Sequence, residues 1–256
     1  MKKYSVLTYN INGYEIIHEI PKEAINPDIE YIYVTDDHNI KSDTWTVVYA
    51  DNLTGSVFDK CYQIRFFPFK YINTDIVMRI DGSMSITNDV MPLFRSFEEV
   101  GYDASVMIHP GRTVIYNEYA AWCQIRNYPP NQAIKCCDFM HVNWRYDINH
   151  YKGLYQGNFC IQRNDNFNNA WNLETYDVLK SLATDPDTIE RIDQTIWSAV
   201  LNMNYSYKNI MPVSNLITNG KFFNWYKHGT EIPMYCTVIP QQYLFNKEVT
   251  PIDYKL

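Results

Sequence analysis

The sequence predicts an α/β fold with a mostly parallel, Rossmann-like sheet flanked by helices, and three observations predict it. Short segments rich in β-branched and aromatic residues alternate with segments of helical spacing along most of the chain. The apolar run DIVMRI at residues 75–80 is nearly continuous, as expected of a strand buried on both faces of a sheet. The 256 residues suffice for one full hydrophobic core, so residues 1–256 are expected to form a single domain.

Six segments have the composition and length of strands. Segments rich in Asn, Gly and Pro, which are typical of turns, separate the first predicted strands. Helical segments between strands favour parallel pairing, because a crossover returns the chain to the same edge of the sheet. In chain order, the predicted strands are residues 4–9, 29–35, 44–50, 75–80, 104–110 and 155–163.

Five segments have helical spacing, and several carry recognisable stop signals. Pro68 ends the first, Gly101 ends the second, and Pro129 with Pro130 closes the third. Residues 208–256 are expected to be irregular and to cover the site. In chain order, the predicted helices are residues 57–70, 92–102, 114–128, 168–183 and 187–203.

Composition excludes some classes of protein. The net charge of −7 argues against a nucleic-acid binder, because neutralising phosphates requires clustered Lys and Arg. No segment approaches the ~20 apolar residues that a transmembrane helix needs. The first apolar run is too short and too polar for a signal peptide. We therefore expect a cytoplasmic protein, or one that meets a membrane peripherally through its acceptor.

Polar residues follow three of the predicted strands at their carboxyl ends. In open α/β sheets, ligands bind beyond these ends. Each set alone equally suits a turn, but three together favour a nucleotide-type ligand. The residues are Thr8, Tyr9, Asn10, Asp36, Asp37, Asp81, Gly82 and Ser83.

Asp81 ends the buried run at residues 75–80 and precedes a glycine. A carboxylate in this position can approach a divalent cation and a diphosphate closely, since Mg²⁺ and Mn²⁺ prefer oxygen ligands. The alternative is an ordinary Asp-Gly turn, which commonly terminates strands. Taken alone, the stretch favours the turn.

Asp193 falls on the apolar side of the predicted helix at 187–203. At about 100° per residue, it lies between Val200 and Trp197 around the helix. A charge placed there needs a partner or a substrate. Pairing with an arginine, capping a loop and binding a substrate all satisfy this requirement.

Cationic residues near predicted strand and helix ends suit anionic oxygens. His109 and Arg112 follow the strand at 104–110, and Glu118 lies in the next helix. Arg65 and Lys70 flank an aromatic stretch, and His228 lies in the irregular tail. Solvated surface positions are the alternative for each of these.

Taken in order, these segments resemble a glycosyltransferase-like family that includes plant mucilage-related and turgor-regulation-defect proteins and bacterial polysaccharide-locus members. The resemblance covers about residues 4–203, and the order of motifs is more specific than any one of them. The matching motifs are LTYNINGYE (7–15), YIYVTDD (31–37), Trp45, Arg65 to Lys70, RIDGSMSI (79–86), HPGRTVIYNEYAA (109–121), QGNFCIQR (156–163) and RIDQTIWSAVL (191–201).

The resemblance implies a GT-A-like fold, a nucleotide-diphospho-sugar donor (UDP- or GDP-linked) and glycosyl transfer to a hydroxyl of a saccharide or glycan precursor. It places the polar residues of the first two strand ends near the nucleotide. Asp81 takes the place of the Asp-x-Asp signature, but Ser83 stands where the second carboxylate belongs. The resemblance implies that Mn²⁺ or Mg²⁺ binds through Asp81 and His228. The missing second carboxylate argues against this metal dependence.

The resemblance also implies roles for the remaining candidates. Asp193 and Gln194 match an Asp-Gln pair beneath the donor sugar of several retaining enzymes, although Asp193 could equally act as the base of an inverting one. Gly157 and Asn158 would let the backbone close on the sugar. Neutralisation of the leaving diphosphate would fall to Arg65, Lys70, His109 and Arg112, with Glu118 nearby.

Two other functions compete with this reading. The missing second carboxylate would suit a catalytically inactive relative that binds nucleotides or glycans. A metal-dependent hydrolase ranks last, because the sequence contains no compact His/Asp cluster.

Overall fold

The computed structural model describes residues 2–109, 153–182, 193–206, 208–213 and 220–232, together with residues 112, 115, 118, 136, 138–140 and 142. Most of the predicted helix at 114–128, and the beginning of the one at 187–203, lie outside the described residues. None of the described helices is long and apolar enough to cross a membrane.

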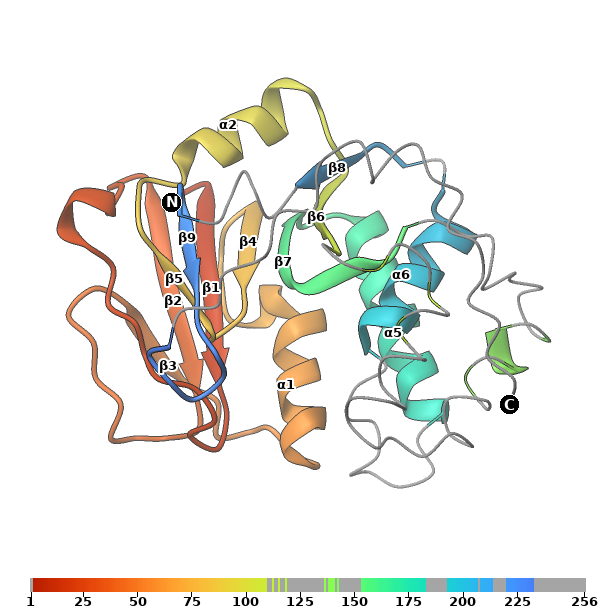
Figure 1. The fold of residues 1–256 in the computed structure, drawn as a ribbon, viewed down its shortest axis with the longest axis horizontal. Helices are drawn as coiled ribbons and strands as arrows, with labels where there is room; N and C mark the ends of the chain where they lie inside the picture. The colour runs from red at the N-terminus through yellow and green to blue at the C-terminus, as the bar shows by residue number, and fades with distance from the viewer. Residues whose placement is uncertain are drawn as a thin grey trace.

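A seven-stranded sheet forms the centre of the described fold (Figure 1). The order across the sheet is β3-β2-β1-β4-β7-β6-β8, and every neighbouring pair is parallel except the two that β7 makes. The predicted mostly parallel α/β sheet is therefore confirmed. The strands are β1 (Tyr4–Asn10), β2 (Ile29–Thr35), β3 (Thr46–Tyr49), β4 (Ile76–Ile80), β6 (Ala104–Ile108), β7 (Tyr155–Arg163) and β8 (Ile210–Val213).

The strand order reverses between β1 and β4. From β1 the chain continues through β2 to β3 on one side, whereas β4 pairs with β1 on the other. Open α/β sheets bind ligands at the carboxyl ends of strands where such a reversal occurs. Because β7 is antiparallel, its first residues lie at this same edge, with Phe159 opposite Ile80 at the end of β4.

Helices cover both faces of the sheet. Helix α2 (Met91–Glu99) packs on one face, and α1 (Val57–Phe66), α5 (Asn166–Leu182) and α6 (Asp193–Asn204) pack on the other. Two short 3-10 helices, η1 (Lys22–Ala24) and η2 (Pro68–Lys70), precede β2 and β4. The result is a sheet with helices on either side (Figure 1).

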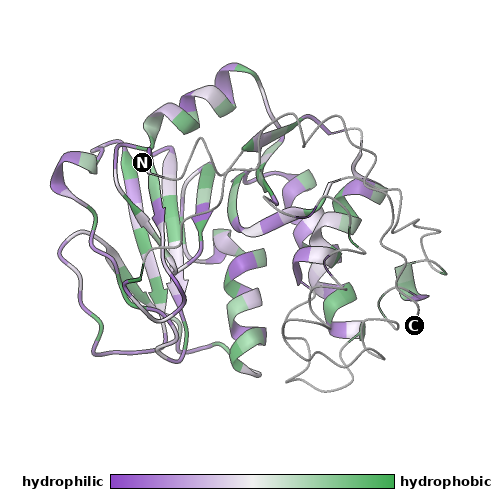
Figure 2. Ribbon diagram, in the orientation of Figure 1, coloured by the Kyte–Doolittle hydropathy of each residue, from purple (hydrophilic) through white to green (hydrophobic). Residues whose placement is uncertain are grey.

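Alternating side chains of the strands supply both halves of the core. In β1, Val6 belongs to the apolar cluster on the α2 side, whereas Leu7 packs with Ile64 of α1 on the other side. Successive side chains of a strand point to opposite faces, so both faces must be apolar to be covered. In Figure 2 the sheet strands carry green, hydrophobic bands between paler and purple ones.

Helix α1 begins and ends where its sequence places the signals. The Ser56 side chain caps the helix by accepting a hydrogen bond from the Asp59 backbone N–H (3.2 Å). Such a cap satisfies one of the amide groups left unpaired at a helix start. Pro68 lacks an N–H and cannot continue the helix, which ends at Phe66, two residues before the proline predicted to stop it.

The prediction of an irregular tail from residue 208 is wrong for part of that segment. It contains β8 and also β9 (Phe223–Trp225), which pairs antiparallel with β5 (Met84–Ile86). Strands β5 and β9 have three residues each and are therefore too short to show a periodic pattern. The β5–β9 ribbon brings the residues after β9 to the edge of the sheet where Asp81 lies.

Candidate active site

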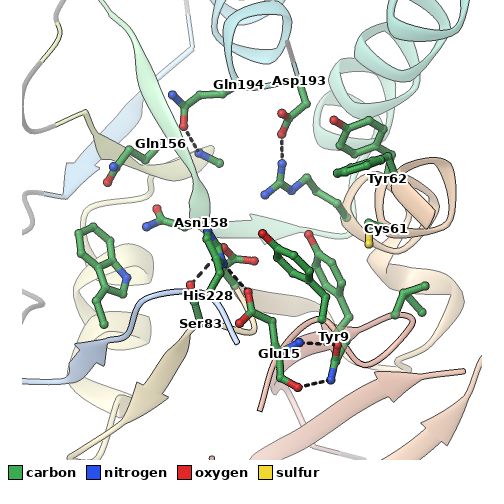
Figure 3. A pocket seen from close by; sticks show the side chains of 18 of the residues that line it. Tyr9, Glu15, Cys61, Tyr62, Ser83, Gln156, Asn158, Asp193, Gln194 and His228 are labelled. Carbon is green, nitrogen blue, oxygen red and sulfur yellow. Dashed lines mark hydrogen bonds and ion pairs between the residues drawn. The ribbon is translucent and has the colours of Figure 1, made fainter. Parts of the chain in front are cut away.

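A pocket of about 360 Å³ lies at the carboxyl ends of β1 and β4 and the beginning of β7 (Figure 3). Its volume falls at the lower end of the range of small-molecule sites. The pocket brings together most of the predicted site residues, from both halves of the chain. These are Tyr9, Asn10, Arg65, Asp81, Ser83, His109, Arg112, Glu118, Gly157, Asn158, Asp193, Gln194 and His228.

Asp81 forms a tight turn and also lines the pocket. Its backbone carbonyl accepts a hydrogen bond from Met84 N–H (2.9 Å). Its carboxylate accepts from the Gly82 backbone N–H (3.1 Å) and from the Ser83 hydroxyl (3.3 Å). The turn predicted for Asp-Gly-Ser is present, and it presents the carboxylate to the pocket.

The space around position 82 is too small for any side chain, so the turn requires glycine there. A Cβ at this position would lie 2.8 Å from the Tyr9 carbonyl oxygen and 2.9 Å from Cγ of Glu15. Side-chain carbons do not approach other atoms that closely. The absent side chain lets the ends of β1 and β4 meet, with Glu15 packed directly against the turn.

Glu15 is a site residue that the sequence reasoning missed. Its buried carboxylate pairs with the His228 imidazole and accepts a hydrogen bond from the Gly229 backbone N–H (2.9 Å). The Asn10 side-chain amide holds the Glu15 backbone in place on both sides (2.6 and 2.9 Å). Glu15 therefore connects the loop after β1 to the segment after β9. His228 uses its Nδ1 in this ion pair.

Arg65 of α1 pairs with Asp193 at the start of α6 (Figure 3). Both side chains are largely buried. Burial lowers the pKa of Arg65, but the neighbouring Tyr9 and Asp81 outweigh it and leave the pKa raised. The guanidinium is therefore always charged, and the arginine partner considered for Asp193 is present.

Arg79, the next-to-last residue of the buried strand β4, is a second feature that the sequence reasoning did not single out. Its side chain is 2% exposed and donates a hydrogen bond to the Gly157 carbonyl (2.7 Å). The guanidinium also lies 5.8 Å from the Trp197 ring, a cation–π contact. Burial and the nearby Arg65 charge lower the pKa of Arg79. This arginine ties β4 to β7 directly beneath the pocket.

Gln194 is held by two hydrogen bonds. Its carbonyl oxygen accepts from the Gly157 backbone N–H (3.2 Å), and its amide donates to Glu118 (3.1 Å). Glu118 is buried and forms an ion pair with Arg112. The sequence predicted these residues separately, and the structure joins them into one network beside Asp193.

His109 does not supply positive charge to this network. Burial, with a further contribution from Arg112, lowers its pKa to about 3. Its Nδ1 accepts a hydrogen bond from the Arg112 backbone N–H (3.0 Å). Glu118 lies 3.8 Å from Nε2, but its charge is already paired with Arg112. Burial therefore disfavours the charged imidazole, which argues against the predicted role of His109 in neutralising a diphosphate.

Several predicted residues lie outside the described pocket lining. Asp36 accepts a hydrogen bond from the Asn12 backbone (2.8 Å), and Asp37 accepts one from the Asn39 backbone (2.8 Å). Asp37 is thus the turn residue that the sequence allowed as an alternative. Neither carboxylate reaches the lining from the end of β2.

Thr8 and Lys70 also lie apart from the pocket. Thr8 is buried within β1, and the Lys70 ammonium lies 4.6 Å from the centre of the Phe67 ring. Neither belongs to the described lining. Of the four residues expected to neutralise a diphosphate, Arg65 and Arg112 therefore bring charge to the pocket.

A divalent cation would find oxygen ligands here but no complete protein cage. Asp81 and Glu15 both line the pocket, and carboxylates suit Mn²⁺ and Mg²⁺. Within the part of the chain that the structure describes, no group of three or more His, Cys, Asp or Glu side chains is placed to hold a metal ion. The residues fit an ion that takes most of its ligands from water and substrate.

No protein-family model matches the chain, and no curated protein is detectably similar to it in sequence. The family resemblance therefore stays a prediction. The case for a function rests on the pocket itself.

Proposed function

We propose that the chain is a glycosyltransferase that moves a sugar from a nucleotide-diphospho-sugar to a hydroxyl of a saccharide or glycan-precursor acceptor. The observation that carries the proposal is the meeting of Asp81 and Asp193 in one pocket at the strand-order reversal. That edge of an α/β sheet is where nucleotides bind. Fold alone does not name a function, so the charges of the pocket carry the next step.

Asp81 differs from the other described carboxylates that line the pocket. Glu15, Glu118 and Asp193 are each in an ion pair, with His228, Arg112 and Arg65 in that order. Among the described residues, the hydrogen bonds of the Asp81 carboxylate stay within its own turn. A carboxylate accepts about four hydrogen bonds or ligands. Asp81 therefore has oxygens available for a cation that a diphosphate would share.

The transfer exchanges one bond of the anomeric carbon for another. The bond to the diphosphate oxygen breaks, a bond to the acceptor oxygen forms, and the acceptor's proton passes to a carboxylate or to the departing diphosphate. Arg65 lines the pocket as the cationic half of its ion pair with Asp193, and its guanidinium N–H groups would face the leaving group. The Arg65 pair fixes the Asp193 carboxylate, which would stabilise oxocarbenium-like charge on the sugar or accept the acceptor's proton.

Mn²⁺ or Mg²⁺, where bound, would be held by Asp81 together with diphosphate oxygens, and would neutralise charge on the leaving group. Ser83 donates its hydroxyl to Asp81 in the turn, so it orients this carboxylate rather than replacing a second one.

Calorimetric titration with UDP, GDP and CMP, with and without Mn²⁺, tests the proposal. We expect one nucleoside diphosphate to bind, and Asp81→Asn to weaken it by roughly 10- to 100-fold, the range for a hydrogen bond or ligand contact to a charged group. Asp36→Asn is the matched control, because Asp36 lies outside the described lining. Absence of binding by all three nucleotides under both conditions would refute the proposal.

A catalytically inactive nucleotide- or glycan-binding relative is the second candidate. Two observations favour this candidate. Asp193 is already paired with Arg65, and the Gln194 amide is already hydrogen-bonded to Glu118 and Gly157. This candidate predicts nucleotide binding without any hydrolysis of a donor sugar. Hydrolysis by the wild type that Asp193→Asn abolishes would exclude it.

A further inference from the structure

Unpartnered polar atoms gather among the residues of this pocket that come from β7 and β9. Trp225 Nε1, Gln156 Oε1 and Asn158 Oδ1 are buried and have no hydrogen-bond partner among the described residues. All three residues line the pocket, and Trp225 is only 7% exposed. Leaving a buried polar group without a partner is costly, so such groups need an explanation.

Backbone contacts place these residues around the Asp81 turn. The Asp81 N–H donates to the Asn158 carbonyl (2.8 Å). On the other strand pair, Trp225 lies opposite Met84, and the Tyr226 N–H donates to the Ser83 carbonyl (2.9 Å). Asn158 and Trp225 are therefore held beside the same short turn, from β7 and from β9, and Gln156 lies two residues before Asn158.

Gln156 and Asn158 are two residues apart on β7, at the place where its register against β6 shifts. Figure 3 shows their amides on the same side of β7, away from Cys61 and Tyr62 of α1. The pocket thus has an apolar wall from α1 and a wall of amide oxygens with an indole N–H from β7 and β9.

We infer that the wall formed by Trp225, Gln156 and Asn158 is a subsite for a sugar ring. A hydroxyl both donates and accepts hydrogen bonds, so sugar hydroxyls satisfy two carbonyl oxygens and one N–H together. An ionised phosphate oxygen accepts only and would repel the two carbonyl oxygens.

This inference rests on the proposed function. It assigns one wall of the pocket to binding the sugar rather than the nucleotide. The sugar ring has two possible sources, the donor's transferred sugar and the acceptor saccharide. Both offer the same hydroxyl chemistry, so the experiment must separate them.

Saturation-transfer NMR with methyl glucoside, methyl galactoside and methyl mannoside tests the subsite without relying on a nucleotide. We expect saturation transfer to at least one glycoside from the wild type, with UDP or GDP present or absent. Trp225→Phe keeps the ring and removes the N–H, and should weaken glycoside binding roughly three- to tenfold, as expected for one neutral hydrogen bond. Gln156→Met should act in the same direction.

Trp197→Phe is the matched control. Trp197 also carries a buried Nε1 without a described partner, but it lies outside the described lining of the pocket. This variant should leave glycoside binding at the wild-type level. No saturation transfer from the wild type, or equal weakening by Trp197→Phe and Trp225→Phe, would overturn the inference.

Titrations with UDP against UDP-glucose, and GDP against GDP-mannose, identify the source of the ring. If Trp225→Phe weakens the sugar nucleotide but not the free nucleotide, the subsite holds the donor's sugar. If it weakens the glycosides alone, the subsite holds the acceptor. Glycoside binding without any nucleotide binding would refute the proposed function but support the subsite. Nucleotide binding without glycoside binding would support the proposed function but refute the subsite.

Discussion

His109 illustrates how burial decides the chemistry of a single residue. The sequence placed it after a strand with Arg112, where it could have been a cation for an anionic ligand. Burial and Arg112 instead lower its pKa to about 3, so the neutral imidazole is a fixed part of the pocket wall. Its contribution to folding then depends on pH in a definite direction.

Folded His109 releases its proton near pH 3, whereas an unfolded histidine does so near pH 6.5. Between these values the unfolded state binds more protons, so stability falls as pH falls through this window. We expect His109 to lower the free energy of unfolding by about 1.4 kcal/mol per pH unit below pH 6.5.

The variant His109→Asn has no proton to bind, so its stability should fall less steeply between pH 6.5 and pH 4. Urea denaturation of both proteins at pH 7, 5.5 and 4.5 measures this, because the carboxylates titrate in both. Parallel dependence of the two stabilities on pH would contradict a buried neutral histidine.

Sequence reasoning found the residues whose signal is local and missed those whose partners are distant. Asp81 and Asp193 stood out because each interrupts an apolar pattern. Glu15 carries no such signal, since its partner His228 is 213 residues away. Arg79 is an exception: it is the one charged residue of Ile76–Ile80, a local signal that was not used.

At the scale of elements, Asp59 links α1 to α5. Its carboxylate is buried and accepts hydrogen bonds from the Tyr176 hydroxyl (2.8 Å) and the Lys180 ammonium (2.9 Å). Arg65, which pairs with Asp193, lies on the same helix about 1.7 turns further along. The link therefore connects the packing of two helices to the geometry of the pocket.

Asp59→Ala should lower the free energy of unfolding by roughly 1.5–3 kcal/mol, because it removes hydrogen bonds to a buried charged group. The matched control is Asp51→Ala, which removes an exposed carboxylate paired with His38 and should cost no more than about 0.5 kcal/mol. Urea denaturation compares the two. Equal losses from both variants would show that Asp59 does not join the helices.

The longer elements were predictable and the shortest were not. The bounds of β2 match the predicted segment, because a run of β-branched and aromatic residues ends in turn residues on both sides. The three-residue strands β5 and β9 form because they pair with each other across the chain. No local pattern encodes that pairing, so the ribbon that carries Trp225 to the pocket was not foreseen.

For the whole molecule, the strand order is what assembles the site. Strand β4 crosses to the far side of β1, and antiparallel β7 begins at the edge where β4 ends. This arrangement brings Asp81, Gly157 and Asp193 into one pocket although they lie far apart in the sequence. The account therefore predicts one active site that uses all three segments at once.

A donor screen by mass spectrometry tests this claim most directly. The wild type is incubated with a mixture of UDP-, GDP- and CMP-linked sugars, with Mn²⁺ and Mg²⁺. We predict that one sugar nucleotide is consumed with release of its nucleotide, and that Asp193→Asn slows this by at least about 100-fold. Survival of every donor in the presence of folded wild-type protein would contradict the account.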